Sequence, residues 1–383
     1  MLLPNFLRAS GVVGRRAVTA GAALVLAVSA HSASATPLSL LQAGLTQSVT
    51  DGQPGAIGLV RQSGVSQYAA AGLSTTSPSV AADPSSRFRI GSNTKAFVST
   101  VILQLEAQGL LSINDTVDHW LPGSVNANGN NGALITIKQL LNMTSGIPDY
   151  LANPSVSVPY ALNITLRAYT PQDLVNIATS SAPTNAPGAA YSYSNTNYVL
   201  AGMIIEKITG HGLDQEIQQR IITPLGLANT FFPITDPNLY GNYLHGHNIS
   251  LFNGDVSVSN VQVTWASGAI VSTLDDLATF HRALIQGNLL PPAQTAELKT
   301  TVPTGTAGVA FGLGVIWDTA TGCAGAWAYN GEVLGYFSSI FTSADGTSQV
   351  VTVTNGTNMT LSLTTGMQDM LNGEVAAYCA MNP

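Results

Sequence analysis

Ser92 and Lys95 lie three residues apart, where a strand expected over residues 87–90 meets a helix expected over residues 94–108. At helical pitch, residues i and i+3 share one face, so the Lys95 amine can reach the Ser92 hydroxyl. A serine is a weak nucleophile until a base takes its proton, and a partly buried lysine can be neutral enough to do so. The spacing predicts a nucleophile with its base, although a solvated first helical turn produces the same Ser-x-x-Lys pattern.

A second polar cluster, Tyr-Ser-Tyr-Ser-Asn at residues 191–195, precedes an apolar helix predicted over residues 197–209. The Tyr193 phenol can carry protons if nearby positive charge lowers its pKa, and the Asn195 amide can hold a lysine. The alternative interpretation is a Ser- and Asn-rich helix cap with two aromatic packing residues. By itself, this cluster does not decide between the two.

The elements that must position these residues are strands at both ends of the chain and helices in its middle. Strands are predicted over residues 56–62, 66–73, 311–317, 325–329, 336–342 and 349–354. Helices are predicted over residues 38–50, 197–209, 213–222 and 361–379, and others begin after the capping residues Thr136, Thr170 and Thr273. The economical architecture is an α/β fold, in which one sheet is built from both chain ends and a helical domain is inserted.

The composition limits the classes of partner. Among 383 residues, 13 are Lys or Arg and 20 are Asp or Glu, which gives a net charge of -7, and only 9% of residues are charged. A hydrophobic content of 45% excludes a disordered chain. The acidic balance argues against a nucleic-acid partner, because binding phosphates requires clustered Lys and Arg. Only four lysines occur, at positions 95, 138, 207 and 299.

The chain begins with a segment typical of an export signal. Arg8, Arg15 and Arg16 precede the apolar residues 17–30, and Ala-Ser-Ala at residues 33–35 is a small-residue cleavage site. We therefore expect residues 1–35 to be removed and the mature chain to be secreted, with no membrane anchor. In an exported chain, the only two cysteines, Cys323 and Cys379, are expected to form a disulfide that ties the segment before the last strands to the C-terminal helix.

Three features together resemble the penicillin-recognising serine enzymes. They are the run Phe-Arg-Ile-Gly-Ser-Asn-Thr-Lys at residues 88–95, the segment 184–210 and Trp265. The chain is most similar to secreted D-alanyl-D-alanine carboxypeptidases of the actinomycete type, and less so to class C β-lactamases and related esterases. Its two cysteines also occupy the positions that those carboxypeptidases use.

This resemblance implies a β-lactamase/DD-peptidase-like α/β fold whose antiparallel sheet is flanked by helices. It implies a sheet domain of residues 36–93 plus 268–383 and a mainly helical domain of residues 94–267. The implied chemistry is acyl transfer: Ser92 attacks a carbonyl, Lys95 and Tyr193 move protons, and Asn195 orients them. The backbone N–H groups of Ser92 and Glu332 would form the oxyanion hole. No cofactor and no metal are implied.

The third motif of the family is altered in this chain. Where the family has Lys or His, then Ser or Thr, then Gly, this sequence has Tyr329-Asn330-Gly331, followed by Glu332. An arginine that receives the terminal carboxylate in the carboxypeptidases falls at Ile316. The predicted substrate-binding residues are therefore Tyr329, Asn330, Gly331, Glu332, Ile316 and Trp265. Because a carboxylate buried without a cation is costly, we expect the substrate to lack the free carboxylate typical of the family, as an ester or an amide does.

Several functions remain open at this stage. The acyl group can pass from Ser92 to water or to an amine. The chain could be a true D-alanyl-D-alanine carboxypeptidase acting on peptidoglycan stems. It could instead be an esterase or ester-to-amide transacylase of specialised metabolism, in which Glu332 orients an incoming amine. A non-catalytic penicillin-binding sensor is disfavoured by the intact Ser92, Lys95, Tyr193 and Asn195 set.

His245 and His247 could supply two metal ligands. No carboxylate or third histidine is suitably spaced to complete such a site, so an ordinary loop is favoured and no metal site is predicted.

Overall fold

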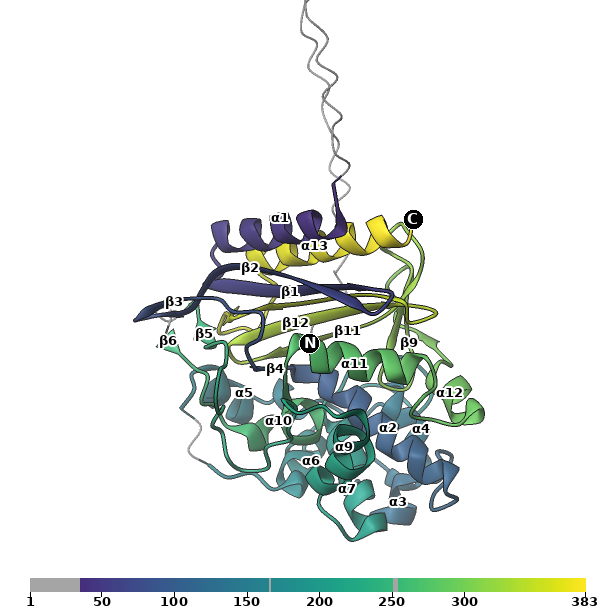
Figure 1. Ribbon diagram of the computed structural model, residues 1–383. Coiled ribbons are helices and arrows are strands. Elements are labelled where there is room, and N and C mark those ends of the chain that lie inside the picture. Colours follow the sequence, from purple (N-terminus) through teal and green to yellow (C-terminus); the bar gives the residue numbers. More distant parts are fainter. Residues whose placement is uncertain (1–34, 165–166, 251–253) are drawn as a thin grey trace, which may run out of the picture.

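A nine-stranded antiparallel sheet joins the two ends of the chain in the computed structural model (Figure 1), which describes residues 35–164, 167–250 and 254–383. The strand order is β3-β2-β1-β13-β12-β11-β10-β9-β8. The join is made by β1 (Gly55–Gln62) and β13 (Ser348–Thr354), with Ala56 opposite Thr354. The prediction of one sheet made from both termini is confirmed, whereas the expected signal segment lies outside the described residues except for Ala35.

The remaining strands flank this central pair or form small separate sheets. The main sheet also contains β2 (Val65–Thr76), β3 (Ser79–Ala81), β8 (Val302–Pro303), β9 (Val309–Phe311), β10 (Ile316–Asp318), β11 (Ala326–Val333) and β12 (Tyr336–Ser343). Two short sheets are formed by β4 (Phe88–Arg89) with β7 (Val271–Ser272), and by β5 (His247–Asn248) with β6 (Gly254–Asp255) and β14 (Gly356–Thr357).

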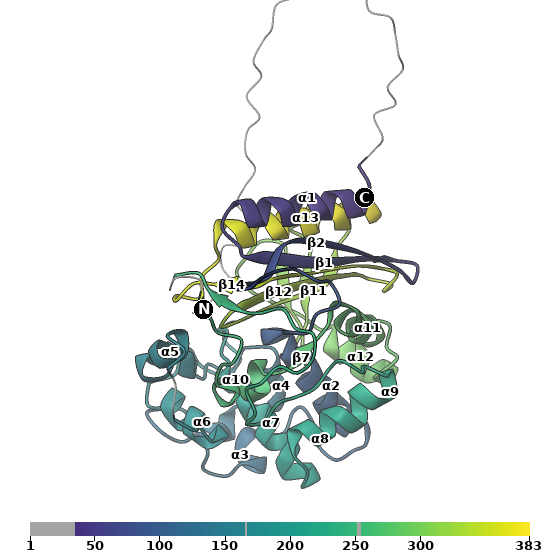
Figure 2. The same ribbon diagram turned by 60° about the vertical axis from the view of Figure 1, so that its left-hand side comes forward.

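Helices cover both faces of the sheet. Figures 1 and 2 show α1 (Pro37–Thr50) and α13 (Thr365–Met381) lying side by side on one face, with most other helices on the opposite side. Those others are α2 (Thr94–Ala107), α3 (Val117–Trp120), α4 (Ile137–Leu141), α5 (Pro154–Ala161), α6 (Pro171–Thr179), α7 (Thr196–Thr209), α8 (Leu213–Ile217), α9 (Thr223–Leu225), α10 (Val261–Gly268), α11 (Leu274–Ile285) and α12 (Pro292–Leu298).

Each face of the sheet has its own hydrophobic core. Leu41 and Leu45 of α1 and Met370 of α13 pack on Val60 and Phe337 from the sheet. On the opposite face, one larger cluster runs from the sheet through the helices without a break. The sheet and the helices therefore share a core, and the domain boundaries given above remain predictions.

The helix caps predicted at Thr136 and Thr170 are confirmed, and both are capping boxes. The Thr136 side chain accepts from Gln139 N, and the Thr170 side chain accepts from Asp173 N, while the Gln139 and Asp173 side chains accept from the capping backbone in return. These reciprocal bonds satisfy first-turn N–H groups and fix where α4 and α6 begin. The predicted helix over residues 197–209 is also confirmed, as α7, and it ends at Gly210.

Three predicted elements differ in the structure. The strand predicted over residues 311–317 is two strands, β9 and β10, because the chain reverses where Gly312 N donates to Val315 O. The strand expected at residues 87–90 is shortened to β4, which pairs with β7 and not with the main sheet. The last helix begins at Thr365 and not at residue 361, because the Thr364 side chain caps it by accepting from Met367 N.

Cys323 and Cys379 form the predicted disulfide, which ties the segment before β11 to α13. In the ranges that the structure describes, no helix is both long enough and apolar enough to cross a membrane.

Replacing Cys323 and Cys379 together by serine is expected to lower the free energy of unfolding by about 4 kcal/mol, because the bond closes a loop of 56 residues in the unfolded chain. Urea unfolding of the oxidised parent and the double variant, followed by circular dichroism, measures this difference. A loss below about 1 kcal/mol would contradict the chain-entropy account.

Candidate active site

The structure brings the four predicted catalytic residues together at the junction of β4 and α2. Ser92 lies in a single 3-10 turn, Gly91–Asn93, and Lys95 follows it in the first turn of α2. Tyr193 and Asn195 come from the segment that leads into α7, with Asn195 at the N-cap. The Tyr193 hydroxyl lies 2.7 Å from Ser92 Oγ, and Lys95 Nζ lies 2.8 Å from the same atom.

The contacts of Lys95 suit a neutral amine. Its Nζ lies 2.9 Å from Asn195 Oδ1 and 2.8 Å from the Ser267 carbonyl oxygen, two groups that can only accept hydrogen bonds. The third neighbour, the Ser92 hydroxyl, can donate. A neutral amine has two N–H bonds for the two acceptors and one lone pair for the Ser92 proton. Burial lowers the pKa of Lys95 to about 7, an effect that the Asp149 carboxylate partly opposes.

Tyr193 has the properties of a neutral proton donor. Burial raises the pKa of its phenol, and the nearby Asp149 carboxylate acts in the same direction, although the Ser92 hydrogen bond opposes them. The Lys95 amine, which carries a positive charge only when protonated, has its Nζ 5.0 Å from the centre of the Tyr193 ring. Because Lys95 titrates far more readily than Tyr193, the lysine is better suited to take the Ser92 proton.

Asp149 supports the site and was missed by the sequence analysis. One carboxylate oxygen accepts from Asn195 Nδ2 at 3.0 Å, and the other accepts from Leu151 N at 3.1 Å, which caps a short 3-10 turn. Asp149 thus fixes the Asn195 amide with its oxygen directed at Lys95. The only local sequence signal is a possible helix cap, and such a signal does not distinguish a buried positioning residue from a surface cap.

A strained backbone position delivers the Ser267 carbonyl. Trp265 has φ of 26° and ψ of -123° inside α10, a conformation that L-residues rarely adopt. The displaced turn is held by Tyr150, whose hydroxyl donates to Val263 O at 2.6 Å and contacts Ser267 Oγ at 3.1 Å. The distorted end of α10 therefore presents Ser267 O to Lys95.

Two glycines allow the nucleophile turn to lie directly against β11. A Cβ on Gly91, which has φ of 54°, would meet Glu332 N at 2.8 Å, and a Cβ on Gly331 would meet Ile90 O at 2.0 Å. Any side chain at either position would separate the turn from the strand. Asn93 Nδ2 and Ser338 Oγ lock this approach through bonds to each other and to Ile90 O.

The geometry of the hairpin directs the Glu332 N–H toward this turn. Val333 and Tyr336 flank a two-residue connection and form its hydrogen-bonded closing pair, so the next pair, Glu332 with Phe337, is a non-hydrogen-bonded pair. The backbone N–H and C=O of Glu332 therefore point away from β12, toward the β10 side of β11. The pairing of β10 with β11 runs over residues 326–328 of β11 and does not extend to Glu332. This free strand edge places the Glu332 N–H beside Ser92, where the sequence predicts an oxyanion hole.

A cleft of about 100 Å³ opens beside Ser92, Tyr193 and Asn195. Its walls include Leu151 and Tyr160 from the helical side, and Tyr329, Asn330, Glu332 and Val333 from β11. Tyr329, which the resemblance places at the position of the family's cation, is buried and lies edge-on to Phe311. Its hydroxyl is directed toward Tyr193 without meeting hydrogen-bond geometry. The cleft wall next to Tyr193 is therefore aromatic and uncharged.

Two residues predicted to bind substrate lie elsewhere. The Trp265 ring packs on Gly202 of α7 in the helical core, because the strained turn directs it inward. Ile316 stands opposite Ala328 and is not among the residues that line the cleft beside Ser92. It lines instead a cavity of about 240 Å³ next to α13, whose lining also includes Tyr329 and Asn330.

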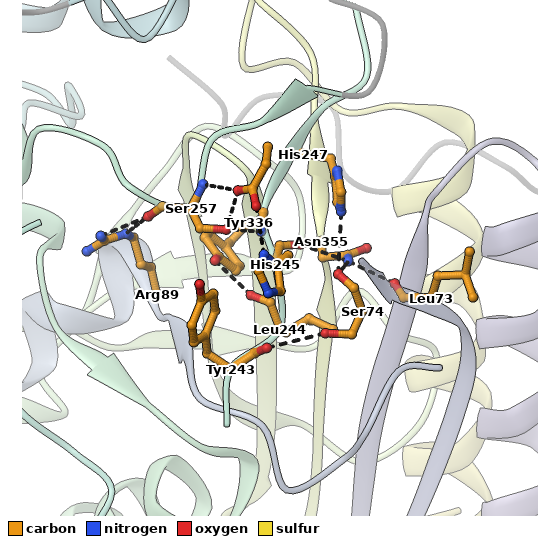
Figure 3. A network of polar contacts seen from close by, with 12 residues as sticks. Leu73, Ser74, Arg89, Tyr243, Leu244, His245, His247, Ser257, Tyr336 and Asn355 are labelled. Atoms are coloured by element: carbon orange, nitrogen blue, oxygen red, sulfur yellow. Dashed lines mark hydrogen bonds and ion pairs between the residues drawn. The ribbon is translucent and has the colours of Figure 1, made fainter. Parts of the chain in front are cut away.

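The two histidines considered as metal ligands have structural partners (Figure 3). His245 Nδ1 lies 2.7 Å from an Asp255 carboxylate oxygen, and His247 Nε2 lies 3.4 Å from the Ser74 carbonyl. Asn355 donates to the Leu73, Ser74 and His245 carbonyls of the same network. These bonds attach the segment around β5 to the sheet. Within the described ranges, no group of three or more His, Cys, Asp or Glu side chains is arranged to hold a metal ion.

The family model described as Beta-lactamase matches residues 41–365, which is most of the chain. The chain belongs to the beta-lactamase family. The predicted resemblance to penicillin-recognising serine enzymes is thereby confirmed, and with it the fold.

Known relatives include amidases and a longer protein. A solved structure of a D-stereospecific amidohydrolase from Streptomyces sp. is 34% identical with a TM-score of 0.81, covering 88% of this chain and 98% of that one. D-amino acid amidase from Ochrobactrum anthropi SV3 is 22% identical with a TM-score of 0.76, covering 88% and 98%, and shows the shared fold. Protein flp of Staphylococcus aureus is 35% identical over 158 residues, 41% of this chain, and the match spans only 30% of its own length.

Acylation of Ser92 is expected to speed up as the pH rises through about 7 and then to level off, because only neutral Lys95 can accept the proton.

Asp149→Asn keeps an oxygen for Asn195 but removes the charge that raises the pKa of Lys95. The rising limb should therefore move to lower pH in this variant. Single-turnover rates with an uncharged ester, measured from pH 5 to 9, test both statements. A flat profile, or a shift of the variant to higher pH, would contradict them.

Proposed function

We propose that this protein is a serine amidohydrolase or esterase that works through an acyl-enzyme on Ser92. The observation that carries the proposal is the Lys95 amine, fully buried, 2.8 Å from Ser92 Oγ and otherwise surrounded by hydrogen-bond acceptors. The Tyr193 hydroxyl on the same oxygen supplies the second proton-transfer group. A buried base and a neutral phenol on one serine support acyl transfer more directly than a binding role.

In the proposed acylation, Lys95 takes the Ser92 proton while Ser92 Oγ bonds to the carbonyl carbon. The backbone N–H groups of Ser92 and Glu332 stabilise the oxyanion that forms. Tyr193 gives its proton to the leaving nitrogen or oxygen as the bond to the carbonyl carbon breaks, and the Lys95 ammonium restores the phenol. Water or an amine then attacks the acyl-enzyme by the reverse route, which releases Ser92.

The substrate we propose is an amide or ester without a free carboxylate next to the scissile bond. Tyr329 and its aromatic neighbours offer no charge to a carboxylate on the Tyr193 side of the cleft. The 34% identity over nearly the whole length of the Streptomyces D-stereospecific amidohydrolase supports amides or esters of D-amino acids. The same absence of charge disfavours a D-alanyl-D-alanine carboxypeptidase, whose substrate ends in a carboxylate.

We further propose that the protein acts outside the cytoplasm after losing residues 1–35. The disulfide between Cys323 and Cys379 supports this location, because such bonds persist in oxidising compartments.

Incubation with D-phenylalanine methyl ester or D-phenylalanine amide is expected to add one aminoacyl group to the protein, located on Ser92 by peptide mapping. Intact mass spectrometry after rapid acid quenching measures this adduct, and Ser92→Ala should lack it. Decay to the free acid indicates hydrolysis, and a new amide formed with added amine indicates transfer. An adduct that persists in Ser92→Ala, or none with any ester or amide, would overturn the proposal.

Tyr329→Lys is expected to raise the acylation rate by benzylpenicillin at least tenfold, because a cation beside Tyr193 can pair with the penicillin carboxylate. Tyr329→Phe, which adds no charge, is the matched control and should show no such gain. Stopped-flow acylation kinetics compare the two variants with the parent. Equal rates in the Lys and Phe variants would show that Tyr329 does not determine the preference for uncharged donors.

A further inference from the structure

The position of the proton donor divides the cleft into a leaving-group side and an acyl side. Tyr193 must stand next to the leaving atom to protonate it, so the leaving group lies toward Tyr193 and its neighbour Tyr329. The rest of the acyl group then extends the other way along the cleft. Besides Tyr193 and Tyr329, the residues that line the cleft and can meet the acyl group include Leu151, Tyr160, Val333 and Glu332.

Glu332 is one of the residues that line the cleft, and its side-chain carboxyl is enclosed. Both carboxyl oxygens are buried, and neither makes a hydrogen bond in the described part of the chain. Its charge acts on the Tyr160 phenol across the cleft. The Arg89 guanidinium, whose charge also acts on Tyr160, donates to the backbone carbonyls of Ser257 and Pro237 and not to Glu332.

A buried carboxyl without a hydrogen-bond or charged partner destabilises the folded protein unless a ligand supplies that partner. Burial raises the pKa of Glu332 to about 8, so an arriving cation would find a group that is easily ionised near neutral pH. In the proposed mechanism, the backbone N–H of Glu332 faces the reacting carbonyl. The side-chain carboxyl of the same residue is therefore close enough to contact a substituent on the acyl group. An α-ammonium group is the cation that a D-amino acid amide or ester carries beside its carbonyl.

We infer that Glu332 is the binding group for the ammonium of the acyl donor, and that the protein therefore selects aminoacyl amides and esters with a free amino group. This inference rests on the proposed acyl-enzyme function and adds the recognised part of the substrate. It also assigns Glu332 to the donor and not to an incoming amine, because an acceptor takes the place of the leaving group beside Tyr193.

The test compares D-phenylalanine methyl ester with N-acetyl-D-phenylalanine methyl ester, which lacks the positive charge. For the parent protein, kcat/KM is expected to favour the free amine. Glu332→Gln keeps the backbone N–H and the side-chain shape, and should lower the ratio of the two kcat/KM values about 10- to 100-fold, the loss of one charge-assisted bond. Glu374→Gln is the matched control, since Glu374 is also a fully buried carboxyl but lies in α13 on the far face of the sheet.

A binding measurement gives a readout that does not depend on turnover. In a Ser92→Ala background, calorimetry should show weaker binding of D-phenylalanine amide when Glu332→Gln is added, and thermal melting checks that both proteins are folded. An unchanged ratio and unchanged affinity in Glu332→Gln would overturn this inference while esters still acylate Ser92. A change only in the rate of transfer to added amines would overturn it in favour of an acceptor role. Absence of any acyl-enzyme would overturn the proposed function, and this inference with it.

Discussion

The burial of one amine governs the architecture of the site. Lys95 has no exposed surface, and its nitrogen makes hydrogen bonds with Ser92, Asn195 and Ser267. Removing an ammonium from water is expensive, so the enclosed group gives up its proton at a much lower pH than a free lysine does. In the proposed mechanism, that cost supplies a base near neutral pH without a histidine.

Every element around Lys95 is arranged to keep it enclosed and oriented. Asp149 fixes Asn195, and the strained turn at Trp265 aims the Ser267 carbonyl. The close approach of Gly91 and Gly331 brings Ser92 to the free edge of β11. That edge belongs to a sheet whose central strands come from opposite ends of the chain, so the complete fold is needed to bring the nucleophile and the oxyanion donors together.

The sequence predicted those parts of the site that depend on local geometry. Ser92 and Lys95 share a helical turn, so their contact follows from local geometry. Gly210, which ends α7, and the capping threonines mark the ends of helices wherever the fold places those helices. Contacts that depend on tertiary structure were not predictable. Asp149 gives the same local pattern as any cap, and its role depends on a hydrogen bond to a residue 46 positions away. Trp265 and Ile316 were placed in the substrate site, but a backbone distortion turns the Trp265 ring into the helical core, and Ile316 lines the cavity next to α13.

The protonation state of Lys95 is the central claim, and the small number of lysines makes it directly measurable. With only four lysines in the chain, NMR of protein labelled with 13C at the lysine ε-carbons gives few enough signals to assign, and Lys95→Met identifies the relevant one. This signal is expected to titrate with a pKa of about 7. A Lys95 signal that titrates near 10, as in an exposed lysine, would contradict a neutral, buried amine.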